Sequence, residues 1–268
     1  QLIMGGLLIM FMDEVISKWG FGSGISLFIA AGVSESIFIR AFSPLPSPTN
    51  PEMATGAIPA LFQSLAAGDP LNAGIMIASV LATVFVFVVA VYVQAMKIEI
   101  PLSFGRVRGY GIRWPLNFIY TSNIPVILVA ALIANIQLWA RLLENWGYPI
   151  LGSFVNGVPA GGLVAWVSSP NIVRSWITGS LTWLDAAHGL VYALIMMGGA
   201  VMFSIFWMQT AGMDSRSQAK NIMGSGLQIP GFRKDQRVLE TVLDRYIWPL
   251  TVMGGLAVGF LAASADLS

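Results

Sequence analysis

The sequence predicts an all-α fold, a polytopic bundle of membrane helices, and three observations support this class. Hydrophobic residues make up 56% of the 268 residues, whereas charged residues make up only 10%. The mean hydropathy is +0.75. Long uncharged stretches recur along the chain, and about 20 apolar residues suffice for a helix to cross roughly 30 Å of hydrocarbon. So few ionic side chains could not cover a soluble protein of this length.

The uncharged stretches define the predicted helices in chain order. Residues 1–12 are apolar but too few to cross, so they are interpreted as the end of a helix that begins outside the chain. A shorter membrane helix is next predicted from about Ser23 to Ile39. Residues 1–39 would then hold one partial and one complete helix. The four longer spans are predicted at residues 70–96, 116–140, 186–213 and 246–268.

The connecting segments differ in charge, and this difference predicts their sides of the membrane. Residues 97–115 carry four basic residues against one acid, and residues 214–245 carry six basic residues. Cytoplasmic loops are enriched in Lys and Arg, so both segments are predicted to be cytoplasmic loops. Residues 40–69 and 141–185 are rich in Pro, Gly, Ser and Trp and are predicted to be external loops. Five complete crossings alternate between the two sides without conflict.

Two glycine patterns are interpreted as structural. GFGSG (20–24) is similar to a phosphate-binding loop, but it follows MDEVISKW rather than a strand, and no βαβ unit surrounds it. A turn between two helices is therefore favoured. Gly255 and Gly259 stand four residues apart in an apolar span, which is the spacing of small residues that lets two membrane helices approach closely.

Ionisable residues offer little for catalysis. The absence of cysteine excludes disulfides and thiol chemistry within these residues, and the single histidine, His188, excludes a multi-histidine site. Asp185 is predicted to cap a helix with His188 one turn later, so interfacial anchoring is favoured over a proton relay. Glu35 lies inside its span with only Arg40 nearby. It is the stronger candidate for intramembrane chemistry, although pairing or snorkelling is favoured.

The segment TSNIPVILVAALIANIQ (121–137) is apolar, yet it contains a helix breaker and two amides, Pro125, Asn123 and Asn135. Such groups are costly against lipid, so their presence in an apolar run requires an explanation. The basic FGRVRG loop before it projects charge and suits an anionic partner, for which RNA and lipid head groups both qualify. A loop that only fixes topology is the remaining alternative.

Three long segments carry a resemblance to a known family. They are MDEVISKWGFGSGISLFIAAGV, IEIPLSFGRVRGYGIRWPLNFIYTSNIPVILVAALIANIQLW and IPGFRKDQRVLETVLDRYIWPLTVMGGLAVGFLAASAD. They closely resemble SecY in its archaeal form, the central (alpha) subunit of the Sec protein translocation channel, and the resemblance covers essentially the whole chain. It implies two halves around a pore. By this resemblance the chain runs from the end of helix 4 to helix 9, with helices 1–3, the plug and helix 10 outside it.

The resemblance also implies roles for individual residues. Ile25, Ile29 and Ile127 fall on positions of an aliphatic pore ring, which seals because a narrow apolar throat dewets. The helix at 116–140 resembles one wall of a lateral gate, to which Asn123, Pro125 and Asn135 belong. The basic residues expected to bind the ribosome or another partner are Arg106, Arg108, Arg113, Arg233 and Lys234.

The function implied is that of the pore-forming subunit, which translocates secretory polypeptides and releases transmembrane helices laterally into the membrane. The resemblance implies a multi-pass protein of the plasma membrane that is not an enzyme and needs no cofactor or metal. The expected partners are SecE, a small third Sec subunit, the ribosome or a translocation motor, the nascent polypeptide with its signal sequence, and membrane lipids. The alternative is a secondary transporter of small solutes, with Glu35 and broken helices at a midplane site.

Overall fold

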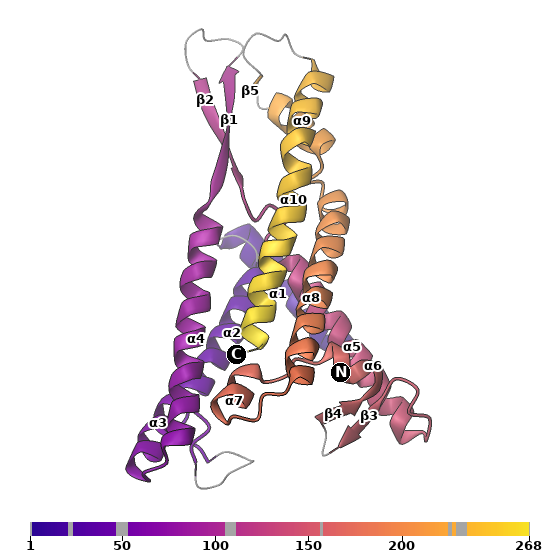
Figure 1. Ribbon diagram of the computed structural model, residues 1–268. Helices are drawn as coiled ribbons and strands as arrows, with labels where there is room; N and C mark the ends of the chain where they lie inside the picture. Colours follow the sequence, from indigo (N-terminus) through magenta and orange to yellow (C-terminus); the bar gives the residue numbers. More distant parts are fainter. Residues whose placement is uncertain are drawn as a thin grey trace. The chain divides into compact units, whose positions relative to one another are not determined.

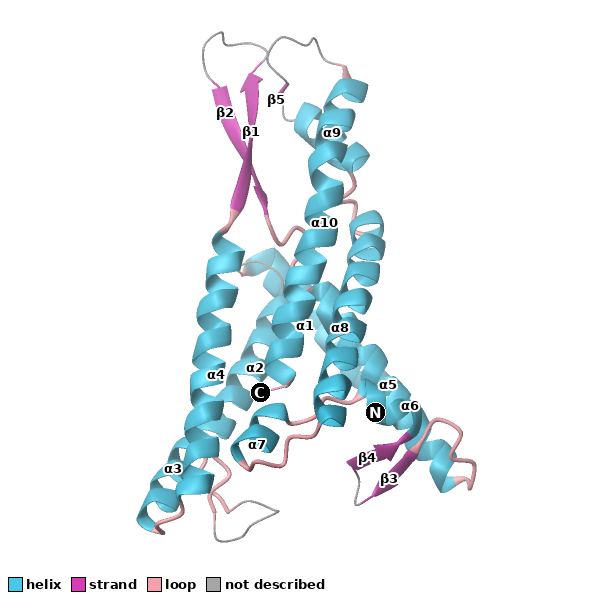
Figure 2. Cartoon of the chain, in the orientation of Figure 1, coloured by secondary structure: helices cyan, strands magenta, loops and turns pink. Residues whose placement is uncertain are grey.

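The structure is a computed structural model that divides into two compact units, Gln1–Val80 and Leu81–Ser268. It describes residues 2–20, 24–46, 53–104, 111–155, 158–224, 227–228 and 235–267. Figures 1 and 2 show the order of its elements, most of which are helices. The predicted all-α membrane class is confirmed, and among the described residues four helices are long and apolar enough to cross a membrane.

The first unit contains α1 (Leu2–Trp19), α2 (Gly24–Phe42), α3 (Ala57–Ala66) and the beginning of α4 (Pro70–Ala95). Helix α2 contacts both α1 and α3. Gly56 permits the entry to α3, because a Cβ on it would lie 2.6 Å from the backbone nitrogen of Ser43. Asp69 caps α4 by accepting a hydrogen bond from the backbone N–H of Leu71, and Asn72 adds a side-chain contact to it.

Three long helices form the centre of the second unit: α5 (Ile124–Asn145), α8 (Trp183–Thr210) and α10 (Gln236–Asp266). Helix α8 packs against both α5 and α10. A Cβ on Gly255 would lie 2.7 Å from the Ser204 hydroxyl, and one on Gly259 would lie 2.8 Å from the Met197 Cα. The close helix contact predicted for these two glycines is therefore confirmed.

Two buried clusters hold this unit together. One lies among α5, α8 and the end of α10 and is centred on Val129, Met196 and Ala263. The other joins the first half of α10 to α9 (Ser215–Gly224) and to the base of a β-hairpin, through Leu243, Ile222 and other apolar residues. Because Leu239, Leu243 and Ile247 recur every four residues, one face of α10 is buried well before its apolar span begins.

The segment predicted as a loop at 97–115 holds a β-hairpin instead. Strands β1 (Lys97–Phe104) and β2 (Gly111–Asn117) pair antiparallel, with Ile100 opposite Trp114. The short strand β5 (Leu227–Gln228) pairs with the other edge of β1, giving the order β2-β1-β5. Apolar residues occupy every second position of β1, a pattern that indicates a β-strand. The loop prediction rested on charge and did not consider this pattern.

At the other end of α5 lie small elements, in a segment predicted as an external loop. They are β3 (Ser153–Val155), β4 (Val158–Gly161), α6 (Gly162–Val167) and α7 (Ile172–Ile177). Gly162 has a φ of +74°, and a Cβ on it would lie 2.5 Å from the Gly152 Cα. This close approach needs glycine at both positions, Gly152 just before β3 and Gly162 at the start of α6.

Some predicted boundaries differ from the observed elements. Helix α5 begins at Ile124 rather than at 116, because residues up to Asn117 pair in the hairpin and a turn follows. Helix α10 begins at Gln236, ahead of the predicted span 246–268, because its first turns pack on α9. Helix α2 covers 19 residues, Gly24–Phe42, where a span from Ser23 to Ile39 was predicted. Its crossing of a membrane stays a prediction.

Candidate functional site: the groove beside α5

A groove of about 270 Å³ lies in the second unit among three helices. Its walls come from the second half of α4, the turn before α5 with the first turn of α5, and the last part of α10. Most of the lining is apolar, and the polar exceptions are Gln94 on α4 and Asn123 before α5. The lining residues are Val86, Ala90, Gln94, Ile119, Asn123, Val126, Ile127, Val258, Leu261, Ala262 and Ala265.

Two residues named from the sequence meet in this groove. Ile127, predicted for the pore ring, is 48% exposed and lines it together with Asn123, predicted for the gate. The opposite face of α5 is buried, since Val129 and Ile133 pack in the core of the unit. The first turns of α5 therefore present an aliphatic side chain and an amide on the face that the rest of the unit does not cover.

The structure contradicts the interpretation of Pro125 as a helix breaker, whereas its place in the lateral gate stays a prediction. In the structure it occupies the second position of α5 and is fully buried. The first N–H groups of a helix have no partner within it, so a proline there costs no hydrogen bond and presets the helical φ. Pro125 is thus a helix-start residue facing the core.

Asn135 lies at an exposed position on α5, as does Asn123. Its amide nitrogen donates a hydrogen bond of 2.8 Å to the Ala131 carbonyl one turn earlier. The cost of this amide in an apolar setting is reduced, because one of its donors is satisfied within its own helix. Asn135 does not line the groove, so the two amides of α5 lie at different sites.

The turn before α5 is fixed by buried polar contacts that the sequence analysis did not find. The Tyr120 hydroxyl donates a 2.6 Å hydrogen bond to the Met213 carbonyl, and the Thr121 hydroxyl contacts that of Ser204 at 3.1 Å. Ser122 follows in the left-handed region at a φ of 59°. Burial, together with the nearby Asp214 carboxylate, raises the pKa of Tyr120 to about 12. Buried polar residues beside a positive-φ residue mark a turn defined by its surroundings.

The other ring residues belong to the first unit. Ile29 is 49% exposed on α2 and borders an open groove along that helix with Phe28, Val33 and Ile37. Ile25 lies in α2, but its side chain is outside the described residues. Glu35 is exposed on the same helix, as is Arg40. Within the described part of its unit, Glu35 is therefore an exposed side chain rather than part of an enclosed site.

Of the five basic residues assigned to a partner surface, Arg113 is the one the structure describes; Arg106, Arg108, Arg233 and Lys234 lie outside the described residues. Arg113 is exposed on β2 and forms a 2.9 Å ion pair with Glu99, its diagonal neighbour on β1. Phe104 at the end of β1 pairs with Leu227 of β5. The sheet therefore places the chain just before residue 105 beside the chain just before residue 229.

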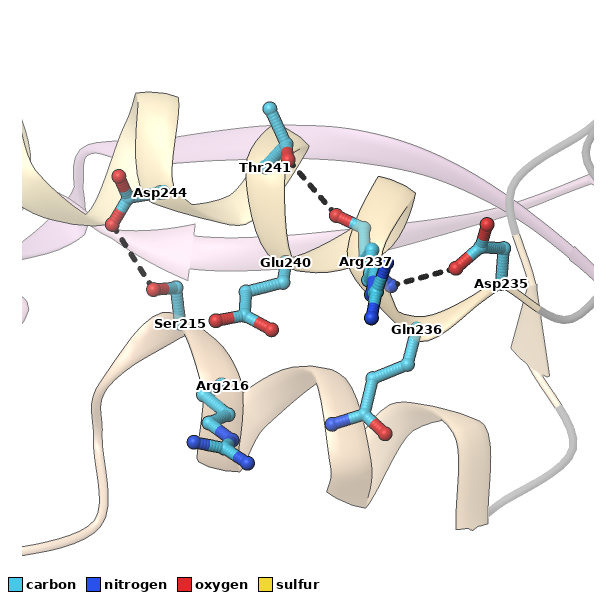
Figure 3. A pocket seen from close by; sticks show the side chains of 8 residues that line it. All are labelled: Ser215, Arg216, Asp235, Gln236, Arg237, Glu240, Thr241 and Asp244. Atoms are coloured by element: carbon cyan, nitrogen blue, oxygen red, sulfur yellow. Dashed lines mark hydrogen bonds between the residues drawn. The ribbon is translucent and has the colours of Figure 1, made fainter.

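A second hollow of about 760 Å³ lies between α9 and the start of α10 (Figure 3). Ser215 and Arg216 come from α9, and the Ser215 hydroxyl donates a 3.0 Å hydrogen bond to Asp244 of α10. Its lining is mixed in charge and contains Arg216 and Arg237 together with three carboxylates, Asp235, Glu240 and Asp244. Such a mixture does not favour ligands of one charge, and we interpret it as a solvated junction between the two helices.

The start of α8 was partly predicted. Thr182, not Asp185, is the N-cap, and Asp185 closes a capping box by accepting a hydrogen bond from the Thr182 N–H. A threonine three residues before an acid was the available signal. His188 contacts the Ala165 carbonyl of α6. Its ring also packs edge-on against Trp166, with 5.4 Å between the two ring centroids. These contacts favour the anchoring role for His188. Within the described part of the chain, no group of three His, Asp or Glu residues could hold a metal.

Taken together, these features define a class: a multi-pass α-helical membrane protein with an uncovered groove beside a membrane helix and an extramembrane β-hairpin. The profile of the SecY family matches residues 1–268. The chain belongs to the SecY family.

Individual relatives support this assignment. The protein translocase subunit SecY of Methanococcus vannielii is 43% identical over 268 residues, which is all of this chain and 58% of that protein. The subunit of Methanocaldococcus jannaschii is 43% identical over 266 residues, 99% of this chain and 57% of its own length. The chain thus spans somewhat more than half the length of the curated relatives it matches. The resemblance to archaeal SecY is confirmed.

Solved structures agree. A structure of a protein-conducting channel has a TM-score of 0.78 and 41% identity, with 98% of this chain and 60% of that chain covered. Sec61 in the canine ribosome–channel complex from the endoplasmic reticulum has a TM-score of 0.72 and 41% identity, with 98% and 59% covered. These comparisons favour a channel over the solute transporter that the sequence left open.

Proposed function

We propose that this chain forms part of the pore-forming subunit of a protein-conducting channel in the plasma membrane. The channel translocates secretory polypeptides and releases transmembrane helices laterally into the lipid. It is not an enzyme and needs no cofactor, because its driving force comes from a partner. The observation that carries the proposal is the groove beside α5, where Ile127 and Asn123 lie uncovered in a chain 41% identical to a protein-conducting channel.

The groove suits a polypeptide in transit. Its apolar walls would exclude ions, since a narrow apolar passage dewets, yet they offer no fixed polar pattern that would select a sequence. In this proposal Ile25, Ile29 and Ile127 contribute to the ring, and α5 is a wall of the gate. A run of leucines then partitions into lipid, because each central leucine favours membrane insertion by roughly 0.3 to 0.6 kcal/mol. A central charged residue disfavours insertion by about 2.5 to 3.5 kcal/mol.

The β1–β2 hairpin and the residues before α10 are the proposed contact with the ribosome or a translocation motor. Arg113 stands exposed on the hairpin, and the strand pairing brings the approaches to both basic loops together. Arginine side chains at such a surface suit RNA phosphates. SecE, a small third Sec subunit, the nascent chain with its signal sequence and membrane lipids complete the proposed partners.

Site-specific photocrosslinking tests the proposal in the full-length protein. Probes replace Ile127 and Asn135, and a ribosome-bound nascent chain carries a signal sequence. A matched probe at Leu194, which is 59% exposed on α8, serves as a surface control. We expect crosslinks to the nascent chain from positions 127 and 135 that disappear when the apolar core of the signal becomes polar. Crosslinks equal to those from position 194, with the ribosome bound, would remove the conduit from α5.

A further inference from the structure

The segment between α5 and α8 was predicted to be an external loop, but its surface is not that of a loop in water. Between Asn145 and Asp185 the single charged residue is Arg174. Loops exposed to water are usually rich in polar and charged residues, because these replace the hydrogen bonds of bulk solvent. This segment instead contains Trp146, Trp166, Trp176 and Trp183.

One face of the segment is packed against the rest of the second unit. Val164 and Val167 of α6 are buried, and Gln137 of α5 donates a 3.2 Å hydrogen bond to the Ser168 hydroxyl. His188 of α8 contacts the Ala165 carbonyl. These contacts fix which face of the segment points inward, so the opposite face is a defined surface.

Elsewhere the segment carries large apolar side chains that the described chain leaves exposed. Ile150 is 79% exposed and Trp183 is 89% exposed. We call the following six residues the outer apolar surface, because each is well exposed: Trp146, Tyr148, Ile150, Val158, Trp176 and Trp183. An apolar surface of this extent on a soluble loop would promote aggregation, so it requires a partner.

Its height along the bundle indicates the partner. Helix α5 has 22 residues and so is about 33 Å long, close to the roughly 30 Å of the hydrocarbon layer. Trp146 and Tyr148 follow its last residue directly, and Trp183 begins α8. Trp and Tyr are enriched at this depth, because their rings bury apolar area while their polar edges reach water.

The neighbouring turns of α5 and α8 also carry exposed apolar residues. Leu138 and Trp139 near the end of α5 are exposed, as is Leu184 in the first turn of α8. We propose that the outer apolar surface lies in the membrane–water interface at the end of the bundle opposite the β1–β2 hairpin, with bilayer lipid as its partner. This inference does not depend on the proposed transport function.

Two contacts tie this surface to α5. The Phe154 N–H donates a 2.9 Å hydrogen bond to the Glu144 carboxylate, and the Arg141 guanidinium lies 5.0 Å from the centre of the Phe154 ring. Because Phe154 belongs to β3, the hairpin of β3 and β4 is fixed to the last turns of α5. The inserted side chains would therefore hold the end of α5 at a set depth.

Collision measurements on spin labels test the inference in the full-length protein, reconstituted in phosphatidylglycerol-containing vesicles, with any other cysteine removed. The labelled variants are Ile150→Cys and Val158→Cys. Leu194→Cys on the exposed face of α8 is the lipid control, and Arg113→Cys on the hairpin is the water control. All four positions are exposed, so the label should leave the fold intact.

The measured quantity is the ratio of the label's collision rate with oxygen to its collision rate with the nickel complex. We expect this ratio at positions 150 and 158 to be several-fold above the ratio at the water control, position 113. It should stay below the ratio at the lipid control, position 194. This order would place the surface at the interface. A ratio equal to that at 113 would mean that the segment stands in water, and the inference would be wrong. Protection from both reagents would show that protein covers the surface, which would overturn it equally.

Discussion

The hydroxyl of Thr121 lies 3.1 Å from the hydroxyl of Ser204, and both side chains are buried. This contact joins the turn before α5 to the last turns of α8. Together with the Tyr120 bond to Met213, it fixes the point from which α5 starts. Any movement of α5 must therefore carry α8 with it or break a buried hydrogen bond.

Replacing Thr121 with valine should lower the free energy of unfolding by about 1–3 kcal/mol, because Ser204 would keep its place in the core without this partner. Thermal unfolding of the purified protein in detergent measures the change. Thr210→Val is the matched control, since Thr210 is exposed and bonds only within α8. The double variant Thr121→Val, Ser204→Ala should lose less than the sum of the single changes. Strict additivity would show that the two hydroxyls do not interact.

Gly259→Ala should also destabilise the protein, by roughly 1–3 kcal/mol, because the new methyl group would meet the backbone of Met197. Gly198 provides a close control on the partner helix, since a Cβ there meets nothing within 4 Å. Gly198→Ala should be neutral or stabilising by up to about 1 kcal/mol, because alanine is the better helix former. Equal effects of the two variants on the unfolding temperature would refute the close contact between α8 and α10.

Stability should fall at high pH through Tyr120. Its pKa is raised from 10.0 to about 12 in the folded protein, so the unfolded chain ionises first as the pH rises. The contribution is complete below pH 10 and is lost between pH 10 and about 12. Unfolding temperatures across this range should drop less steeply for Tyr120→Phe than for the parent. A slope in Tyr120→Phe equal to that of the parent would contradict the assignment.

Removing Arg113 should weaken ribosome binding without affecting the fold. Its ion pair with Glu99 is exposed and contributes about 0–1 kcal/mol to stability. If Arg113 contacts an RNA phosphate, Arg113→Ala should reduce the dependence of log affinity on log salt by about one unit or slightly less. Sedimentation of the protein with ribosomes over a salt series measures this. Arg174→Ala, at the other end of the bundle, is the control, and an equal loss in both variants would argue against the hairpin as the contact.

The sequence was sufficient to locate the long apolar helices and insufficient for their exact starts and for the short elements between them. Uncharged length reports a membrane helix directly, so α4 and α8 were found close to their observed bounds. The charge counts that mark a cytoplasmic segment do not report strand pairing, and the β1–β2 hairpin was missed. The resemblance assigned Ile127 to the pore ring and Asn123 to the lateral gate, and both residues line the groove beside α5.

The interpretation of Pro125 as a helix breaker was wrong for a physical reason. Its effect depends on whether it lies in the first turn of a helix or inside it, and the start of α5 is set by contacts of Tyr120 and Thr121 with residues more than 80 positions away. Local patterns carry no information about such contacts. Thr182 is a different case, because a threonine three residues before Asp185 is a local signal for the cap of α8 that was available in the sequence.

Asn135 offers the sharpest test of lateral release. Its exposed amide makes this face of α5 less favourable against lipid, so in the proposed gate it would help an apolar signal to displace the closed arrangement. Asn135→Leu should favour the closed gate, so that insertion would need a more hydrophobic signal. We expect the threshold to rise by about one or two leucines, each of which favours insertion by roughly 0.3 to 0.6 kcal/mol. A series of model signals with increasing leucine content, scored for membrane insertion, measures the threshold. Asn135→Gln retains the amide and should keep the parental threshold, because the exposed position has room for the longer side chain. A threshold unmoved by leucine, or moved equally by glutamine, would mean that the amide of Asn135 does not tune release.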